Sequence, residues 1–451
     1  MAKPHRPSLS RRGFLQLLGG ATGSLAFSSM FEPRLLLAQS QQGTGKNLVV
    51  CNLLGGLDGL AAYPFTSGPL VSVVNSELRP SLAISPGSAL SIGGQSGLTN
   101  RLGLHPAFAP LHALASSRMK VVQGYGIPGD PGRSHDTCQI LMSLGKSRME
   151  GTSMVGFLAR LMDTQNWESM QYWALRVPNS TDVNSEKNPP VTTWDLDSLD
   201  FTRIGWEDDN ARDYIADLRK SLIELRSAST PLHEKYSSAL RSMHDTVAVV
   251  RSDIAEQSVG NNSAGNYSDD WLGYQFRDAA KILASKVNSP NVSFRNKDML
   301  ILTAQDGYDT HSDQNNSFAQ EAGIGARLGE LASNLAVFYR DLQTFGLLDD
   351  TVIVLVSEFG RTTYQNAPVS QGTAGTDHGH GSNTLIIGPT TAGVVGDAPT
   401  ANELRDQWYN ATIPKVDFRN VFGDIFSWMG IPPSSIFDET GYTYSSLGLF
   451  S

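Results

Sequence analysis

Histidine and acidic side chains gather in a few short stretches of this 451-residue chain, and their types point to metal chemistry. The densest stretch is Gly372–Asn383, which places two of the nine histidines, one aspartate and four glycines within twelve residues. Imidazole combined with carboxylate suits zinc, iron or manganese, whereas ligand sets made only of oxygen suit calcium or magnesium. The glycines would let the backbone bend closely around an ion.

Similar residues follow four apolar runs elsewhere in the chain. The runs are Asn47–Leu54, Met119–Gly124, Met299–Ala304 and Thr351–Ser357. The side chains that follow them, in chain order, are Asp58; then Arg133, Ser134 and His135; then Asp309 and His311; then Glu358 and Arg361; and finally Asp377, His378 and His380 from the glycine-rich stretch. Ligands in open α/β sheets bind beyond the carboxyl ends of the strands, so we expect these groups to meet on one rim.

Each motif taken alone has a simpler explanation. An Asp-x-His sequence is often a turn, and Asp58, after two glycines, could cap a helix. Ser134, at the expected start of a helix, could be a cap as readily as a nucleophile. Glu358 is the stronger signal, because a carboxylate that follows a buried strand needs a partner. His380 is left open between a ligand, a substrate contact and a partner that orients a ligand.

The elements that must position these residues indicate an α/β fold. The apolar runs are continuous, as in strands buried on both faces of a parallel sheet. Apolar residues at steps of four and three from Ile324 to Leu342 predict an amphipathic helix between the last two runs, and strand–helix–strand is a crossover unit. Residues 161–207 read as irregular. Further helices are predicted over 214–225 and 236–250, as an insertion within 161–297.

The first 38 residues predict export. Ser-Arg-Arg-Gly-Phe-Leu at 10–15 precedes the apolar run Leu17–Phe27, which is shorter than the roughly 20 residues of a membrane span. This pattern is typical of a twin-arginine signal cleaved near Ala38, and the alternative is a basic tail before a buried helix. The mature chain, residues 39–451, would be a single periplasmic or secreted domain with no transmembrane segment. The twin-arginine translocase would be a partner, and because it carries folded proteins, export is compatible with a metal acquired in the cytoplasm.

Charge narrows the class of partner. Removal of residues 1–38 takes away five basic residues and one acidic residue, which moves the formal net charge from −9 to −13. Such a surface repels nucleic acid and anionic lipid. An anionic substrate would need local positive charge, which bound cations and the guanidinium of Arg133 or Arg361 would supply.

The two cysteines, Cys51 and Cys138, match no zinc-binding spacing. Because they lie far apart in the sequence, we expect buried thiols rather than a disulfide. An oxidising periplasm leaves the bond open.

The ordered set of motifs resembles an exported family known as domain of unknown function 1501, which looks like a branch of the alkaline phosphatase and sulfatase superfamily. The matching motifs are the twin-arginine start, Gly-Gly-Leu-Asp-Gly-Leu (55–60), Leu-His-Pro (104–106), Arg-Ser-His (133–135), Asp-Thr-His (309–311), Ser-Glu-Phe-Gly-Arg-Thr (357–362) and Asp-His-Gly (377–379). The resemblance covers nearly the whole chain and is weakest over 160–290. It implies an alkaline-phosphatase-like fold with a central, mostly parallel sheet flanked by helices.

The resemblance also implies roles for these residues and one or two divalent ions, whether zinc, calcium, magnesium or manganese. By position, the metal ligands would be Asp58, Asp309 with His311, Glu358, and Asp377 with His378, joined by His380; Ser134 would be the nucleophile, with Arg133, His135 and Arg361 as further catalytic residues. The chain departs from the superfamily pattern in two places. Asp309 and His311 are only two residues apart, and Phe359 stands where a histidine would follow the carboxylate.

Two functions follow from these observations. The first is an exported metal-dependent hydrolase of a phosphate, sulfate or related ester, with an anionic small molecule or polymer as substrate. The second is a non-catalytic exported metalloprotein with a structural or binding role at the cell envelope, which the altered ligand pattern favours. A redox enzyme would need a cysteine framework or a dinucleotide fingerprint, and the sequence has neither.

Overall fold

A computed structural model of the chain describes residues 44–151, 154–165, 170–185, 190–193, 196, 250–289, 297–315 and 323–450. The expected signal, residues 1–38, lies outside the described residues. So do the helices expected over 214–225 and 236–250, apart from Val250 at the end of the second. Export, the insertion and the single mature domain of residues 39–451 therefore stay predictions.

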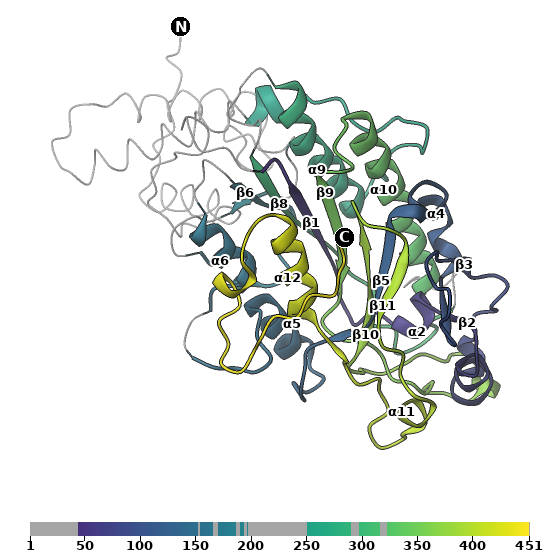
Figure 1. Cartoon of the computed structure of the whole chain (residues 1–451). Helices are drawn as coiled ribbons and strands as arrows, with labels where there is room; N and C mark the ends of the chain where they lie inside the picture. Colours follow the sequence, from purple (N-terminus) through teal and green to yellow (C-terminus); the bar gives the residue numbers. More distant parts are fainter. Residues whose placement is uncertain are drawn as a thin grey trace, which may run out of the picture.

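A central sheet of nine strands organises the described residues (Figure 1). Its strands are β1 (Asn47–Leu53), β5 (Met119–Gly126), β6 (Met170–Ala174), β7 (Val191–Thr192), β8 (Asp298–Gln305), β9 (Thr351–Val356), β10 (Ser382–Ile387), β11 (Gly393–Gly396) and β12 (Val416–Asp417). They lie in the order β11-β5-β10-β9-β1-β8-β6-β7, and β12 also pairs with β5. Every pair is parallel except the two made by β10, which runs antiparallel to β5 and to β9. The predicted mostly parallel sheet is confirmed.

Burial on both faces explains the continuous apolar runs. In β1, Val49 and Cys51 belong to one hydrophobic core, and Leu48 and Val50 belong to another. Successive side chains of a strand point to opposite faces. A strand that is covered on both sides must therefore be apolar at every position.

Helices cover both faces of the sheet, as Figure 1 shows. One face carries α4 (Ala109–Ala115), α9 (Trp271–Asn288) and α10 (Ile324–Thr344), and the other carries α5 (His135–Leu144), α6 (Phe157–Thr164) and α12 (Phe418–Trp428). The helix α10 connects β8 to β9, and both strands pair in parallel with β1. The predicted strand–helix–strand unit and the α/β class are confirmed.

Smaller elements complete the described chain. The short helices are α2 (Gly59–Ala62), α3 (Leu70–Ser72) and α11 (Ala401–Arg405), and a second sheet joins β2 (Phe65–Ser67), β4 (Arg101–Leu104) and β3 (Leu90–Ser91). Single turns are η1 (Val73–Leu78), η2 (Pro80–Leu82), η3 (Pro106–Phe108), η4 (Ser116–Arg118), η5 (Ser180–Val183), η7 (Val250–Ala255), η8 (Val369–Gln371) and η9 (Pro433–Ser435).

Two strands of the main sheet lie where the sequence predicted irregular structure, within residues 161–207. The strand β6 pairs in parallel with β8 and is buried at every position. Its five residues include Gln171, which interrupts the apolar run, although the buried side chain accepts a hydrogen bond from Nε1 of Trp173 at 3.3 Å. A run this short, with a glutamine inside it, gives little strand signal, so the prediction was wrong at this point.

Cys51 and Cys138 are free, buried thiols, as the sequence predicted. They lie in different hydrophobic cores, Cys51 in the one that contains Val49 and Cys138 in the one that contains Leu48. The separation of the two cores by the sheet keeps the sulfur atoms apart.

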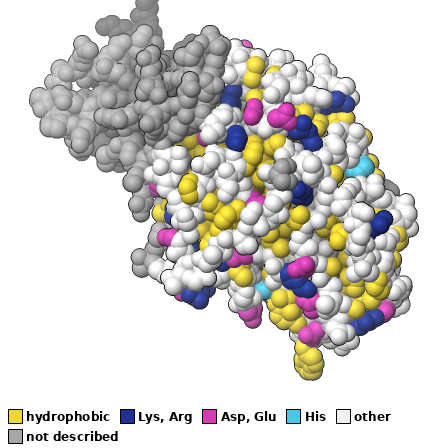
Figure 2. Space-filling view, in the orientation of Figure 1, with side chains coloured by type: hydrophobic (Ala, Val, Ile, Leu, Met, Phe, Trp, Pro, Cys, Tyr) yellow, Lys and Arg dark blue, Asp and Glu magenta, His cyan; other side chains and the backbone are white. Residues whose placement is uncertain are grey.

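Charged side chains of both signs are interspersed on the face of the molecule seen in Figure 2. On this face, lysine and arginine side chains lie beside acidic ones instead of gathering in one basic patch. No helix within the described ranges is long and apolar enough to cross a membrane.

Candidate metal centre

The loops that carry the sequence motifs meet at one edge of the central sheet. The parallel strands β1, β5, β8 and β9 all end at this edge. Because β10 runs in the opposite direction, it begins there, and the residues just before Ser382 join the loops that follow the other strands. The glycine-rich stretch therefore reaches the same rim as the loops after the four apolar runs.

Glycines allow these loops to pack against one another. Gly55 has φ +118°, and a Cβ atom there would lie 2.3 Å from the backbone nitrogen of Asp309. A Cβ atom on Gly379 would lie 2.3 Å from the carbonyl oxygen of Arg361. Both positions need glycine, because any side chain would separate the loops that bring the histidines and acids together.

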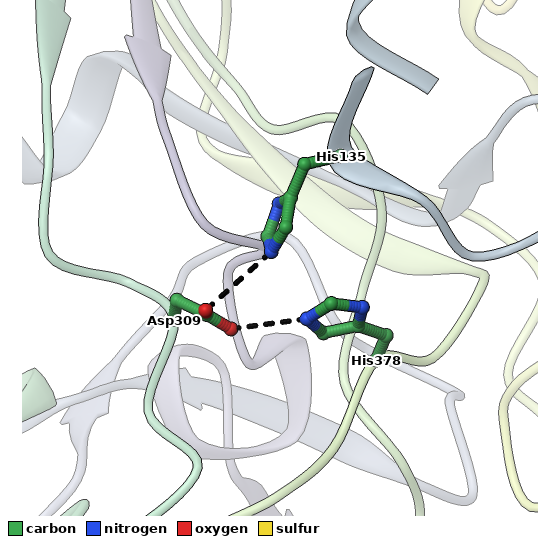
Figure 3. Close-up of side chains that lie close together, drawn as sticks. All are labelled: His135, Asp309 and His378. Carbon is green, nitrogen blue, oxygen red and sulfur yellow. Dashed lines mark hydrogen bonds and ion pairs between the residues drawn. The ribbon is translucent and has the colours of Figure 1, made fainter. Parts of the chain in front are cut away.

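His135, Asp309 and His378 form a cluster in which one ligand atom from each residue lies within 4.8 Å of the others (Figure 3). The Nε2 atom of His135 lies 3.5 Å from Oδ2 of Asp309, and Nε2 of His378 lies 3.2 Å from Oδ1. His311 adds a third imidazole, with Nε2 3.1 Å from Asp309 Oδ1 and 3.0 Å from His378 Nε2. Two ligands bound to one tetrahedral zinc ion lie ~3.3 Å apart, so these spacings suit an ion.

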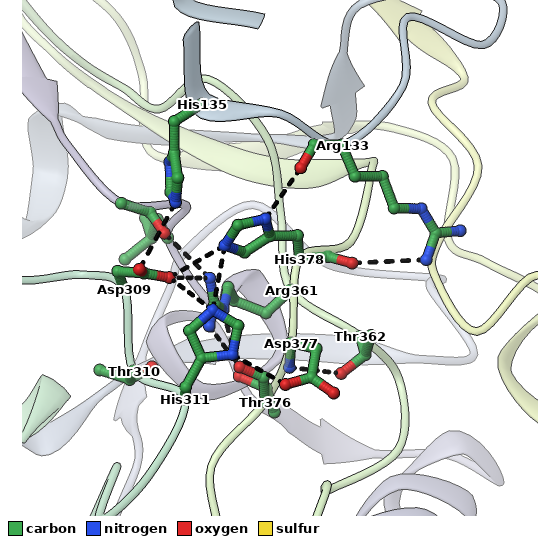
Figure 4. A network of polar contacts seen from close by, with 12 residues as sticks. Arg133, His135, Asp309, Thr310, His311, Arg361, Thr362, Thr376, Asp377 and His378 are labelled. Atoms are coloured by element: carbon green, nitrogen blue, oxygen red, sulfur yellow. Dashed lines mark hydrogen bonds and ion pairs between the residues drawn. The ribbon is translucent and has the colours of Figure 1, made fainter.

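The second ring nitrogen of each imidazole faces a hydrogen-bond acceptor. Nδ1 of His135 lies 2.9 Å from Glu358 Oε1, and Nδ1 of His311 lies 2.8 Å from Asp377 Oδ1. Nδ1 of His378 lies 2.8 Å from the carbonyl oxygen of Arg133 (Figure 4). Ionised carboxylates and carbonyl groups can only accept, so each Nδ1 carries the hydrogen.

The Nε2 atoms, here called the inner nitrogens because they face the centre of the cluster, consequently point lone pairs at one another and at the Asp309 carboxylate when the rings are neutral. His311 Nε2 and His378 Nε2 lie 3.0 Å apart, and both approach the same oxygen of Asp309. These contacts are repulsive unless a proton or a metal ion lies between the atoms. Imidazoles whose outer nitrogen binds a carboxylate or carbonyl are the usual metal ligands of proteins. The residues fit one divalent ion, held by His135, Asp309 and His378, with His311 beside them.

The electrostatics of the protein without metal favour a cation at the same place. Burial opposes ionisation of Asp309, but the hydrogen bond and charge of Arg361 outweigh it and lower the pKa of Asp309. Burial likewise opposes ionisation of Glu358, yet its hydrogen bonds, led by that of His135, lower the pKa of its carboxyl. The same bond raises the pKa of His135. Ionised Asp309 and Glu358 therefore lie beside His135, and their negative charge attracts a cation.

The carboxylates of Glu358 and Asp377 lie at Nδ1 of His135 and His311 and orient these rings, and their role as direct ligands stays a prediction. The Glu358 side chain is 2% exposed. Its Oε1 also accepts from the backbone of Gly55 at 2.9 Å and from Gln139 at 3.1 Å. The partner that a buried carboxylate requires is thus His135. Gln139 was missed, although its position four residues after His135 on α5 could have indicated it.

His380 lies outside the cluster. Its Nε2 is 2.8 Å from the carbonyl oxygen of Ile127, and its Nδ1 contacts the hydroxyl of Tyr409. Burial lowers the pKa of this ring, which keeps it neutral. With both ring nitrogens in hydrogen bonds, His380 holds its loop in place, and its role as a metal ligand stays a prediction.

Both predicted arginines bind other groups of the protein with their guanidinium nitrogens. The Arg361 side chain is 0% exposed, donates from Nη1 to Asp309 at 2.7 Å and to the Gly55 carbonyl at 3.0 Å, and binds Thr376 with its other nitrogens. Arg133 directs its guanidinium away from Asp309, toward the backbone carbonyls of His378 and Tyr409 (Figure 4). That either one clamps a substrate anion stays a prediction.

Ser134 and Asp58 both occupy helix caps, in different ways. Ser134 is the N-cap of α5, but its exposed hydroxyl makes no capping hydrogen bond, so the choice between cap and nucleophile stays open. Asp58 is the N-cap of α2, accepts from the backbone of Leu60 and Ala61, and pairs with Arg79. The capping alternative for Asp58 is confirmed, and the carboxylate lies outside the cluster. Arg79 was missed, because it belongs to no sequence motif.

Comparison with known proteins supports the family resemblance. Residues 279–444 match the model of a family described as a protein of unknown function, DUF1501. No curated protein matches the chain.

Similar solved structures share few residues with this chain. A protein in the alkaline phosphatase superfamily from Vibrio parahaemolyticus is 12% identical, with 97% of this chain and 80% of that chain covered and a TM-score of 0.38. The PsFucS1 sulfatase from Pseudoalteromonas sp. is 10% identical, with 96% and 76% covered and a TM-score of 0.36. The lipoteichoic acid synthase LtaP from Listeria monocytogenes is 9% identical, with 95% and 79% covered and a TM-score of 0.34.

Proposed function

We propose that this member of the DUF1501 family is a metal-dependent hydrolase of a phosphate, sulfate or related ester. The observation that carries the proposal is the group of imidazoles around Asp309, each with its outer nitrogen held by an acceptor. Because the group is rich in nitrogen ligands, zinc or manganese is a better candidate than calcium or magnesium.

The residues around the cluster support ester hydrolysis. A divalent ion at this place would polarise an ester oxygen and lower the pKa of a bound hydroxyl or water. Ser134 lies next to His135 in the sequence, and its hydroxyl makes no helix-capping hydrogen bond. It is therefore the candidate nucleophile. Glu358 holds the Nδ1 hydrogen of His135 and prevents the ring from turning.

The substrate class and the location belong to the same proposal. The chain carries a net negative charge, so an anionic small-molecule or polymer ester would be attracted only by local positive charge, which a bound cation supplies. The twin-arginine pattern at residues 10–15 supports export by the twin-arginine translocase into the periplasm or beyond.

A second candidate is a non-catalytic exported metalloprotein with a structural or binding role at the cell envelope. The observation that favours it is that the guanidinium groups of Arg133 and Arg361 already bind acceptors of the protein itself. Anionic esters are commonly bound by guanidinium groups in bidentate geometry, and neither of these side chains is free to do so.

The experiment is an assay of the purified mature protein with aryl phosphates, phosphodiesters and aryl sulfates, together with measurement of bound metal. Ser134→Ala should lose turnover and keep its metal, whereas Asp309→Ala should lose both. Metal without turnover on any of these esters would favour the second candidate. A well-folded sample that carries no metal and takes up none from added zinc or manganese would refute the metal centre, and with it the hydrolase.

A further inference from the structure

We infer that the metal centre holds one ion, because the guanidinium of Arg79 occupies the place that a second cation would need beside Asp58. The inference deepens the proposed function, since it rests on the same metal centre. It assigns Asp58 and Arg79 a positioning role outside the reacting groups.

Donors already saturate the Asp58 carboxylate. Nη1 of Arg79 lies 2.9 Å from Oδ1 and 2.8 Å from Oδ2. Oδ1 also accepts from the backbone of Leu60 at 3.1 Å and of Ala61 at 3.2 Å, and Oδ2 accepts from Nε2 of Gln314. A carboxylate offers about four lone-pair sites, so none is left for an ion.

Arg79 is fixed in this position by its other nitrogens. Nη2 donates to the carbonyl oxygen of Thr362 at 2.7 Å, and Nε donates to that of Thr363 at 3.3 Å. The side chains of Arg79 and Asp58 are each 1% exposed. A guanidinium held by three protein groups in the interior cannot swing aside to admit a metal ion.

The same contacts tie the end of the first strand to the loops of the metal centre. Gln314, which binds Asp58, accepts with Oε1 from the hydroxyls of Thr310 at 2.9 Å and Thr376 at 2.7 Å. Thr310 follows Asp309, and Thr376 precedes Asp377. Arg79 and Gln314 therefore position the loops that carry the candidate ligands.

Arg361 is a second buried cation, and it interacts electrostatically with both Asp309 and Asp58. It binds Oδ1 of Asp309, while His135 faces Oδ2 of the same residue. The charges of Asp58 and Asp309 are thus each met by an arginine. A second divalent ion placed beside Asp58 would be repelled by two buried guanidinium groups. The described residues fit one ion next to the imidazoles and do not fit a second next to Asp58.

Metal stoichiometry tests the inference without reference to activity. Wild-type protein, titrated with zinc and separately with manganese, is measured by native mass spectrometry. We expect one equivalent per chain, one equivalent in Asp58→Asn, and none in Asp309→Asn. Two equivalents in the wild type, falling to one in Asp58→Asn, would overturn the inference; if Asp58→Asn does not fold, two equivalents in the wild type overturn it alone.

Removal of the Arg79 guanidinium tests the inference by a second measurement, the melting temperature Tm. In Arg79→Met, the carboxylate of Asp58 loses its partner, so we expect a lower Tm that added zinc partly restores. The matched control is Arg419→Met, which removes another buried arginine that pairs with acids, Asp417 and Glu439. Its Tm should fall, and added zinc should raise it only as much as it raises the Tm of the wild type. Equal behaviour of the two variants would contradict the role given to Arg79.

The outcomes separate this inference from the proposed function. One equivalent of metal without turnover on any ester refutes the hydrolase and leaves the single-ion centre standing. Two equivalents with turnover refute the single-ion centre and leave the hydrolase standing.

Discussion

Glu358→Gln should weaken metal binding without unfolding the protein. The carboxylate is buried and accepts the Nδ1 hydrogen of His135 at 2.9 Å. Glutamine has nearly the same volume, and its amide oxygen can still accept from Gly55 and Gln139, which now donate to Oε1. The substitution therefore removes mainly the negative charge that fixes the ring of His135 and increases its basicity.

The magnitude follows from that one bond. A hydrogen bond to a charged group contributes ~1.5–3 kcal/mol, and a neutral one contributes ~0.5–1.5 kcal/mol. The difference of ~1–1.5 kcal/mol corresponds to ~10-fold in a dissociation constant. Loss of the partner of a ligating histidine typically weakens metal binding ~10–100-fold. We expect the Kd for zinc to rise within that range.

The assay is competition for zinc between the protein and a fluorescent chelator at fixed pH. Glu439→Gln is the matched control, because Glu439 is also a buried carboxylate with hydrogen-bonded partners, Ser147 and Arg419, away from the cluster. Its Kd should equal that of the wild type. Equal zinc affinity in Glu358→Gln and the wild type would refute the assignment of His135 as a ligand held by Glu358.

Three further predictions concern pH, metal removal and the loop of His380. In the metal-free protein the pKa of His135 is raised above 6.5 by the hydrogen bond to Glu358, so its contribution to stability is complete below that pH and is lost as the pH rises through the folded value. With zinc bound, stability should instead rise with pH, because protons compete with the ion for the histidines. Thermal denaturation from about pH 5 to about pH 8, with and without zinc, measures the change of stability with pH in each case. Chelation should lower the Tm, since an ion at 100 times its Kd stabilises the fold by ~2.7 kcal/mol; an unchanged Tm would argue against a bound ion. His380→Gln should cost ~1–3 kcal/mol in denaturant unfolding through its bonds to Ile127 and Tyr409, yet keep one equivalent of metal; loss of the metal would show that the ring is a ligand.

The fold was predictable where both faces of a strand are covered. The runs that form β1, β8 and β9 are apolar at nearly every position, because each contributes side chains to both cores. The strand β6 could not be predicted in the same way, since Gln171 is buried within it through a bond to Trp173 that depends on the folded arrangement.

The site was predictable in residue type but not in role. The sequence indicated that His135, Asp309 and His378 belong to one rim, because each follows or precedes a strand at the same edge. It could not show that His135 faces inward while Glu358 lies behind it, since this depends on side-chain directions in loops 223 residues apart. The pairing of Asp58 with Arg79 was equally hidden, because no local pattern connects a helix cap to an arginine between two short turns.

Elemental analysis of the folded, purified protein tests the central claim most directly. The protein should contain one equivalent of a divalent metal, zinc or manganese, per chain, and Asp309→Asn should contain none. A wild-type sample that is fully folded by circular dichroism, carries no metal and takes up none from added zinc or manganese would contradict the metal centre.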